Sequence, residues 1–313
     1  MIAYIDNNFI VDCVGSPHWK ATVLEACRNR LVRIVISPWS IYEIGKASID
    51  KMNEAIRVAE ELEPRWILER ADLQLREFLH AWNDFWNGSR TEFSPIATLS
   101  EVQASFLRVS VQQIANYTLA DYARVWQHPD AHTEAAAEFH RQERIAAWNR
   151  AFFSRGKLMP EVVRAIRMRY VARQMIVARS WQIPLDRIAA RETRILRSSK
   201  LSTIVGFFVD FGGMEDMKAH QVEEAFTFHH WGTEAILNSH RLIDRFHATV
   251  ALPYCDIFVT SDKELIKRSN LIKGQMRFST AIVVSGAEFV DLLQEKLVKL
   301  AGSPGAGGAG TNH

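Results

Sequence analysis

Strand and helix signals alternate at both ends of the chain, and this pattern restricts the fold more than any other feature of the sequence. Near the N-terminus, β-branched runs at residues 2–5 and 32–36 predict strands, each followed by a helical segment. Near the C-terminus, residues 257–260 and 281–284 predict two further strands. Repeated strand–helix units are typical of an α/β fold with a parallel central sheet. The helices expected at the C-terminal end cover residues 233–251, 263–268 and 287–300.

The middle of the chain has a different periodicity. From about residue 50 to 240, apolar residues recur at intervals of three and four and β-branched runs are rare, which predicts helices. Prolines and the Gly212-Gly213 pair divide this stretch into helical segments. The short apolar run at 203–209 fits either a buried strand or a turn of buried helix. We therefore expect a parallel α/β domain that is interrupted by a large all-helical insertion.

These patterns divide the 313 residues into four parts. A chain of this length exceeds one typical domain of roughly 100–200 residues, as a domain with an insertion would. The expected parts are the α/β domain at residues 1–60 and 230–300, the helical insertion at 61–229, and a flexible Gly-rich tail at 301–313.

Composition and cysteine usage predict a soluble, cytoplasmic protein with no membrane partner. The chain is 48% hydrophobic and 24% charged, which is ordinary for a globular protein. Apolar runs fall short of the ~18 residues that would cross a bilayer, and the N-terminus lacks the basic region of a signal peptide. The three cysteines have no C-x-x-C spacing, which argues against a disulfide framework and a structural zinc site.

Positive charge is concentrated in one segment of the expected insertion. Residues 151–200 hold twelve Lys or Arg and three acids, a formal charge of +9, whereas the whole chain carries +2. Arg187, Arg191 and Arg194 recur at helical spacing and form a stripe. The alternative is a solvated face that pairs with acidic helices such as residues 54–77, but three local acids cannot neutralise twelve bases. We expect this segment to bind a polyanion.

Four acidic residues from distant segments are expected to meet at one edge of the sheet. Asp6 directly follows the first strand, and Glu43 lies in the helix after the second. Asp244 lies in the helix before the strand at 257–260, and Asp262 follows that strand. In parallel α/β sheets, functional groups gather beyond the carboxyl ends of the strands.

Such a cluster would carry a large electrostatic penalty. Two carboxylates ~5 Å apart repel by ~3 kcal/mol at an effective dielectric constant of ~20, and four carboxylates make six such pairs. Protonation or a bound cation removes the penalty. Oxygen ligands without histidine or thiolate favour Mg²⁺ or Mn²⁺ over zinc, and a pair of such ions is suited to phosphodiester hydrolysis. The expected metal ligands are Asp6, Glu43, Asp244 and Asp262.

Four motifs around these acids resemble those of PIN-domain nucleases, over about residues 1–60 and 230–300. The closing residues 282–289 are also similar to the final strand and helix of that family. The four motifs are Tyr4-Ile5-Asp6-Asn7-Asn8, Ser37-Pro38-Trp39-Ser40-Ile41-Tyr42-Glu43, Asp244-Arg245-Phe246-His247-Ala248-Thr249-Val250-Ala251 and Asp256-Ile257-Phe258-Val259-Thr260-Ser261-Asp262.

The resemblance implies a PIN-like three-layer α/β/α sandwich and metal-dependent cleavage of RNA by the same four acids. It also implies that Asn8 and Thr260 orient these acids. The interval from Glu43 to Asp244 is far longer than in a minimal domain of that family. The resemblance therefore predicts nothing about how the insertion affects substrate access.

Several candidate residues also have purely structural interpretations. Asp6 and Asp262 could cap the helices that follow them, and Glu43 could be a solvated helix acid. The Glu77-x-x-His80 spacing occurs in di-iron bundles, where a second such motif is required, and this chain has only one.

The segment around Asp244 leaves two further alternatives. Asp244 could form an ion pair with Arg241 or Arg245. His247, one helical turn after Asp244, fits a packing role in a partly buried position better than contact with a substrate phosphate.

Together these features predict a metal-dependent endoribonuclease, with a toxin-like role left open. The alternative is a catalytically inactive RNA-binding or scaffold protein that retains the PIN fold, and a weaker one is a helical metal or interaction protein. Single-stranded DNA as a substrate, a neutralising protein partner and a homo-oligomer are also left open by the sequence.

Overall fold

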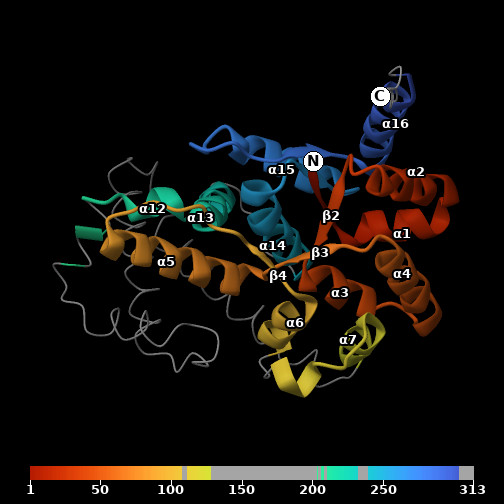
Figure 1. Ribbon diagram of the computed structural model, residues 1–313, viewed down its shortest axis with the longest axis horizontal. Coiled ribbons are helices and arrows are strands. Elements are labelled where there is room, and N and C mark those ends of the chain that lie inside the picture. The colour runs from red at the N-terminus through yellow and green to blue at the C-terminus, as the bar shows by residue number, and fades with distance from the viewer. Residues whose placement is uncertain (108–110, 128–202, 204–205, 208–209, 232–238, 303–313) are drawn as a thin grey trace, which may run out of the picture.

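The computed structural model describes residues 1–107, 111–127, 203, 206–207, 210–231 and 239–302. Its centre is a six-stranded sheet with the strand order β4-β3-β2-β1-β5-β6 (Figure 1). Neighbouring strands run parallel except for β3 and β4, which are antiparallel. The strands are β1 (Ile2–Ile5), β2 (Arg33–Ile36), β3 (Arg65–Ile67), β4 (Ile96–Ala97), β5 (Ile257–Val259) and β6 (Ile282–Val284).

The pairing register aligns the carboxyl ends of the central strands. Ile5 pairs with Val259, and Val259 pairs with Val284 on the next strand. Tyr4 pairs with Val35, one residue before the end of β2. These strands are almost continuously apolar and buried, as expected for a parallel sheet that is covered on both faces. Residues that follow β1, β2 and β5 therefore meet at the same edge.

Helices cover both faces of this sheet. Figure 1 shows α1, α2 and α4 on one side of β1 and β2, and α14 on the other side. The helices near the sheet are α1 (Asn7–Gly15), α2 (Pro17–Arg28), α3 (Pro38–Gly45), α4 (Ile49–Glu61), α6 (Leu99–Leu107), α7 (Leu119–Val125), α14 (Ser239–Tyr254), α15 (Lys263–Lys273) and α16 (Gly286–Gly302), and Val111–Ile114 forms a 3-10 turn.

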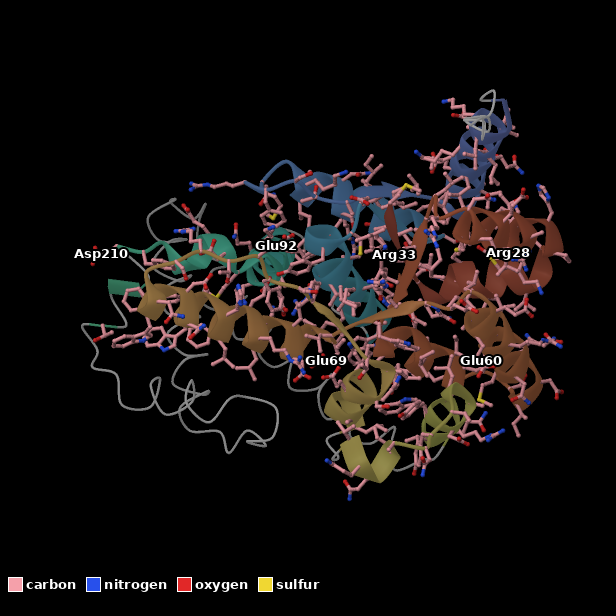
Figure 2. The ribbon with its side chains drawn as sticks, viewed as in Figure 1. Arg28, Arg33, Glu60, Glu69, Glu92 and Asp210 are labelled. Carbon is pink, nitrogen blue, oxygen red and sulfur yellow. The ribbon has the colours of Figure 1, made fainter. Side chains whose placement is uncertain are left out.

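Three helices extend away from the sheet on the side of α14 (Figure 1). Helix α5 (Arg70–Asn87) begins at its N-cap Glu69, close to the sheet, and runs outward toward Asp210 (Figure 2). Helices α12 (Gly213–Asp216) and α13 (Lys218–Trp231) pack along it, and α13 also contacts α14. An aromatic cluster stabilises the part of α5 that lies away from the sheet: the ring of Phe207 contacts Phe78, Trp82 and Phe85.

The predicted α/β architecture with a mainly parallel sheet is confirmed. Each strand expected at the two ends of the chain is present, with its bounds shifted by one residue or less. The helix expected at 233–251 appears as α14, and residues 232–238 lie outside the described part. The closing helix continues to Gly302, two residues into the expected tail.

The expectation of an all-helical insertion at 61–229 is wrong in its first part, because β3 and β4 lie there and extend the sheet. Glu63 adopts a left-handed conformation, with φ of 46°, and Pro64 follows it. This turn leads the chain out of α4, so that Val35 of β2 pairs with Arg65. A strand of three residues is too short to show an alternating pattern.

A large part of the expected insertion lies outside the described residues. Residues 128–202, which include the basic segment, lie outside the described part of the chain. Within the run 203–209, the described residues Thr203, Gly206 and Phe207 are helical, which favours the helical alternative. Among the helices that the structure describes, none combines the length and hydropathy needed to span a membrane.

Candidate active site

The four predicted acids lie around the carboxyl ends of β1, β2 and β5. Asp6 directly follows β1 and is buried, and Glu43 lies in α3, which follows β2. Asp244 lies in α14, and Asp262 is the third residue after β5. The charges of the other three acids all raise the pKa of Asp244, so the fold brings the four carboxylates within electrostatic reach of one another.

Asp6 is both a helix cap and a buried member of this group. Its Oδ1 accepts a hydrogen bond from the backbone N–H of Phe9 at 3.0 Å, which makes it the N-cap of α1. The side chain of Thr260 also forms a hydrogen bond with it. Burial raises the pKa of Asp6 to about 6, and the charge of Glu43 acts in the same direction, against the hydrogen bonds and His247. The capping interpretation is therefore confirmed, and the role of Asp6 as a metal ligand stays a prediction.

Asp262 caps the next helix in the same way. Its Oδ1 accepts hydrogen bonds from the N–H groups of Glu264 at 2.7 Å and Leu265 at 2.9 Å, at the start of α15. Its own N–H donates to Oγ1 of Thr260 at 3.1 Å. Thr260 is fully buried and thus bonds to both Asp6 and Asp262. This position supports the orienting role that the resemblance implies for Thr260.

Glu43 is held by a buried histidine. Its Oε2 lies 3.1 Å from Nε2 of His247, which is 2% exposed. The other ring nitrogen, Nδ1, forms a hydrogen bond with the hydroxyl of Tyr4, and that hydroxyl lies 2.7 Å from Oγ of Ser37. The chain of contacts joins β1, α3 and α14. The packing role expected for His247 is confirmed, but the histidine also bonds directly to a site acid.

Asp244 shows most clearly that the site concentrates negative charge. Burial is the largest cause that raises its pKa, to about 7, and the charge of Asp262 is the next. Glu43 and Asp6 add to the effect, whereas His247 opposes it. A carboxylic acid with a pKa near neutrality gains stability from a proton or a cation close by.

No protein-family model, curated protein or solved structure matches this chain. The chemistry of the site is therefore the basis for assigning a function. Within the described ranges, no three His, Cys, Asp or Glu side chains are grouped closely enough to hold a metal ion as they stand. Two of the acids are turned toward other partners, since Asp262 caps α15 and Glu43 bonds to His247.

The donor set nevertheless fits a divalent cation that prefers oxygen ligands. The capping bonds of Asp262 use only Oδ1, and the histidine contact of Glu43 uses Oε2, so each carboxylate has a second oxygen to offer. The pKa values of Asp244 and Asp6 are raised, and a bound cation would lower them by stabilising the ionised carboxylates. Carboxylate oxygens are the ligands that Mg²⁺ and Mn²⁺ prefer.

The ion pair considered for Asp244 and Arg245 is wrong, because Arg245 turns to a different carboxylate. Its Nη2 lies 2.6 Å from Oε1 of Glu223, in α13. Arg70 bonds to both oxygens of Glu223, at 2.8 and 2.9 Å, and Gln74 donates to Oε2 at 2.6 Å. Burial alone would raise the pKa of Glu223, but the two arginines and these hydrogen bonds together lower it to about 2. The side chain of Arg241 lies outside the described part.

Glu77 and His80 have separate partners. Glu77 is buried and accepts hydrogen bonds from the backbone of Ala219 at 2.8 Å and from the hydroxyl of Tyr254. The ring of His80 instead contacts the backbone oxygen of Thr91 at 3.1 Å. The pair therefore fixes α5 to its neighbours, in agreement with the rejection of a di-iron motif.

Two predicted groups of site residues are not supported by contacts. Asn8 is exposed in the first turn of α1, and the described residues include no hydrogen bond from it to the four acids, so its role stays a prediction. The predicted nucleic-acid-binding residues lie outside the described residues; they are Arg187, Arg191 and Arg194.

Sequence reasoning missed Tyr4 and Ser37 as supports of the site. One signal was available for Tyr4, because residues two apart in a strand point to the same face and Tyr4 precedes Asp6 by two. Ser37 occupies the N-cap position of α3, but its side chain makes no capping bond, and its hydroxyl contacts that of Tyr4.

Proposed function

We propose that this protein is a metal-dependent endoribonuclease that uses Mg²⁺ or Mn²⁺. The observation that carries the proposal is the electrostatic coupling of four carboxylates at the carboxyl edge of the sheet, with the pKa of Asp244 raised to about 7. A cluster of this kind opposes folding when it is ionised, and a divalent cation offsets its charge. A parallel sheet with helices on both faces also supports the PIN-like sandwich.

Each residue of the site has a defined task in this proposal. Asp6, Glu43, Asp244 and Asp262 would hold the cation, and Thr260 keeps Asp6 and Asp262 in place through hydrogen bonds. Divalent cations supply phosphodiester hydrolysis with a water of lowered pKa and with positive charge that offsets the developing charge on the phosphate. Thr260, which is inaccessible to solvent, restricts the orientations of the two acids that it bonds to.

The preference for RNA depends on the basic segment. The +9 charge of residues 151–200 favours a polyanion, and arginines in a helical stripe suit contacts with a phosphate backbone. The aromatic side chains in and beside this segment could stack on unpaired bases. Single-stranded RNA is therefore the first substrate to test.

The test is cleavage of an end-labelled single-stranded RNA with Mg²⁺, with Mn²⁺ and with a chelator. We expect cleavage only with the metal ions, and its loss in Asp6→Asn, Asp244→Asn and Asp262→Asn. The matched control is Asp291→Asn, an exposed acid in α16 that should leave cleavage unchanged. Absence of both cleavage and Mn²⁺ uptake by the wild type would contradict the proposal. Variants that lose activity only because they melt far below the wild type would show that the acids are structural.

A catalytically inactive RNA-binding or scaffold protein is the second candidate. The capping of α15 by Asp262 and the bond from His247 to Glu43 favour it, because a cluster that only stabilises the fold would make the same contacts. RNA binding without cleavage, with unchanged affinity in chelator, is the result that this candidate predicts.

A further inference from the structure

We propose that His247 is a positioning residue for Glu43 and that it aims the carboxylate at the bound cation, an inference that rests on the proposed metal site. The imidazole lies in α14, one turn after Asp244, and bridges to Glu43 in α3. Among the four acids, Glu43 is the one that lies in α3. The orientation of the Glu43 side chain therefore decides whether α3 contributes a ligand to the cation.

When the imidazole of His247 is neutral, one set of hydrogen-bond directions satisfies every group around it. An ionised carboxylate only accepts hydrogen bonds, so Nε2 of His247 carries the hydrogen and donates to Oε2 of Glu43 across 3.1 Å. In the neutral ring, Nδ1 is then an acceptor, and the hydroxyl of Tyr4 donates to it. The oxygen of Tyr4 in turn accepts from the hydroxyl of Ser37 at 2.7 Å. Tyr4 and Ser37 thus fix the tautomer and the orientation of the imidazole.

Burial makes this arrangement rigid. His247 is 2% exposed, and the side chains of Tyr4 and Ser37 are fully buried. The rings of Tyr4 and His247 also contact one another, with centroids 5.7 Å apart. Glu43 is only partly covered, with 23% of its side chain exposed to solvent. A rigid donor therefore holds one oxygen of Glu43 and leaves the other, Oε1, for a ligand.

Hydrogen-bond donors behind metal-binding side chains commonly change metal affinity by about 10–100-fold when they are removed. His247→Phe removes both ring nitrogens and keeps an aromatic ring of similar shape. His247→Gln keeps an N–H donor at about the distance of Nε2. Tyr4→Phe removes only the hydroxyl that orients the imidazole. The matched control is Thr249→Val, because Thr249 is fully buried in the same helix and its hydroxyl has no hydrogen-bond partner among the described residues.

The experiment measures the affinity of the full chain for Mn²⁺ by calorimetry, with thermal melts in chelator to verify folding. We expect about 10–100-fold weaker binding in His247→Phe, a smaller loss in Tyr4→Phe, and near-normal binding in His247→Gln and Thr249→Val. In a Glu43→Gln background, His247→Phe should weaken binding no further, since the residue that it positions has already changed.

Two results separate this inference from the proposed function. If the wild type binds no Mn²⁺, the proposed metal site fails, and the inference fails with it. If the wild type binds Mn²⁺ and folded His247→Phe and Tyr4→Phe bind it equally well, the metal site stands and His247 only packs. Should His247→Phe fail to fold, Tyr4→Phe takes its place in the test. Binding that is unchanged in Tyr4→Phe, or that Tyr4→Phe weakens by the same factor with and without Glu43→Gln, would overturn the positioning role.

Discussion

Replacement of Asp244 by asparagine should stabilise the metal-free protein, and increasingly so as the pH rises. The pKa of Asp244 is raised from 3.8 to about 7, first by burial and then by the charges of Asp262, Glu43 and Asp6. The folded protein thus binds this proton more tightly than the unfolded chain does. The resulting stability is fully present below about pH 3.8 and is lost as the pH rises through about 7.

The size of the effect follows from the shift. At about 1.4 kcal/mol for each pKa unit, the raised pKa of Asp244 destabilises the folded protein by on the order of 4 kcal/mol at pH 8, where the side chain must ionise, and by roughly 2 kcal/mol at pH 5, where it must keep its proton. An asparagine cannot ionise and avoids both costs. Asp244→Asn should therefore exceed the wild type in free energy of unfolding by about 2–4 kcal/mol at pH 8, and by less at pH 5.

Urea denaturation in the presence of a chelator, at both pH values, measures this difference. The control is Asp291→Asn, whose exposed side chain should make the change neutral at either pH. Saturating Mn²⁺ should stabilise the wild type more than the variant, because ligand binding to the folded state adds to its stability. A variant that is less stable than the wild type at pH 8, or a difference that does not grow with pH, would refute the electrostatic reasoning.

Three further predictions concern the parts of the molecule that support the site. Glu223→Gln removes the negative charge that two buried arginines contact, and denaturation should show a loss of about 3–5 kcal/mol. Gly45→Ala places a Cβ 2.5 Å from the carbonyl oxygen of Ala123, so the contact between α3 and α7 must open, and thermal melts should show a loss of about 1–3 kcal/mol. Filter binding at several salt concentrations tests the basic stripe: replacement of its three arginines by glutamine should weaken RNA binding and flatten the plot of log affinity against log salt by roughly two units. The stripe consists of Arg187, Arg191 and Arg194.

The α/β core was predictable because its signals are local. The first strand, Ile2–Ile5, is a short apolar run that ends at a carboxylate, and Ser37 with Pro38 marks the start of a helix. Parallel pairing then follows from the strand–helix alternation, since a parallel strand needs a crossover connection. The same argument placed Asp6 and Asp262 at one edge, and the register of β1 with β5 confirms it.

Long-range pairing decided the features that were missed. Arg65, Trp66 and Ile67 form a strand because β2 offers them an open edge, and nothing within three residues reveals that partner. The arginines that surround Glu223 come from residues 70 and 245, far apart in the sequence. Sequence spacing offered the adjacent Asp244 as one alternative partner for Arg245, and it gave no sign of a carboxylate on another helix.

The role of His247 has the same origin. Its spacing from Asp244 placed both side chains on the same face of one helix, and the sequence analysis favoured a packing role for the histidine over contact with a substrate phosphate. The histidine is indeed buried. Its partners, Tyr4 and Glu43, lie more than two hundred residues away in the sequence. Only the folded structure shows that the imidazole of His247 connects Tyr4 of the first strand to Glu43.

Anomalous diffraction from crystals grown with Mn²⁺ is the most direct test of the metal site. The account predicts a peak at the carboxyl edge of the sheet, at about 2.0–2.2 Å from oxygens of Asp6, Asp244 and at least one of Glu43 and Asp262. The carboxylate of Glu43 should still accept the hydrogen bond from His247. A map without a peak at this edge at saturating Mn²⁺, or with its peaks only at other surface acids, would contradict the assignment of these residues as a metal site.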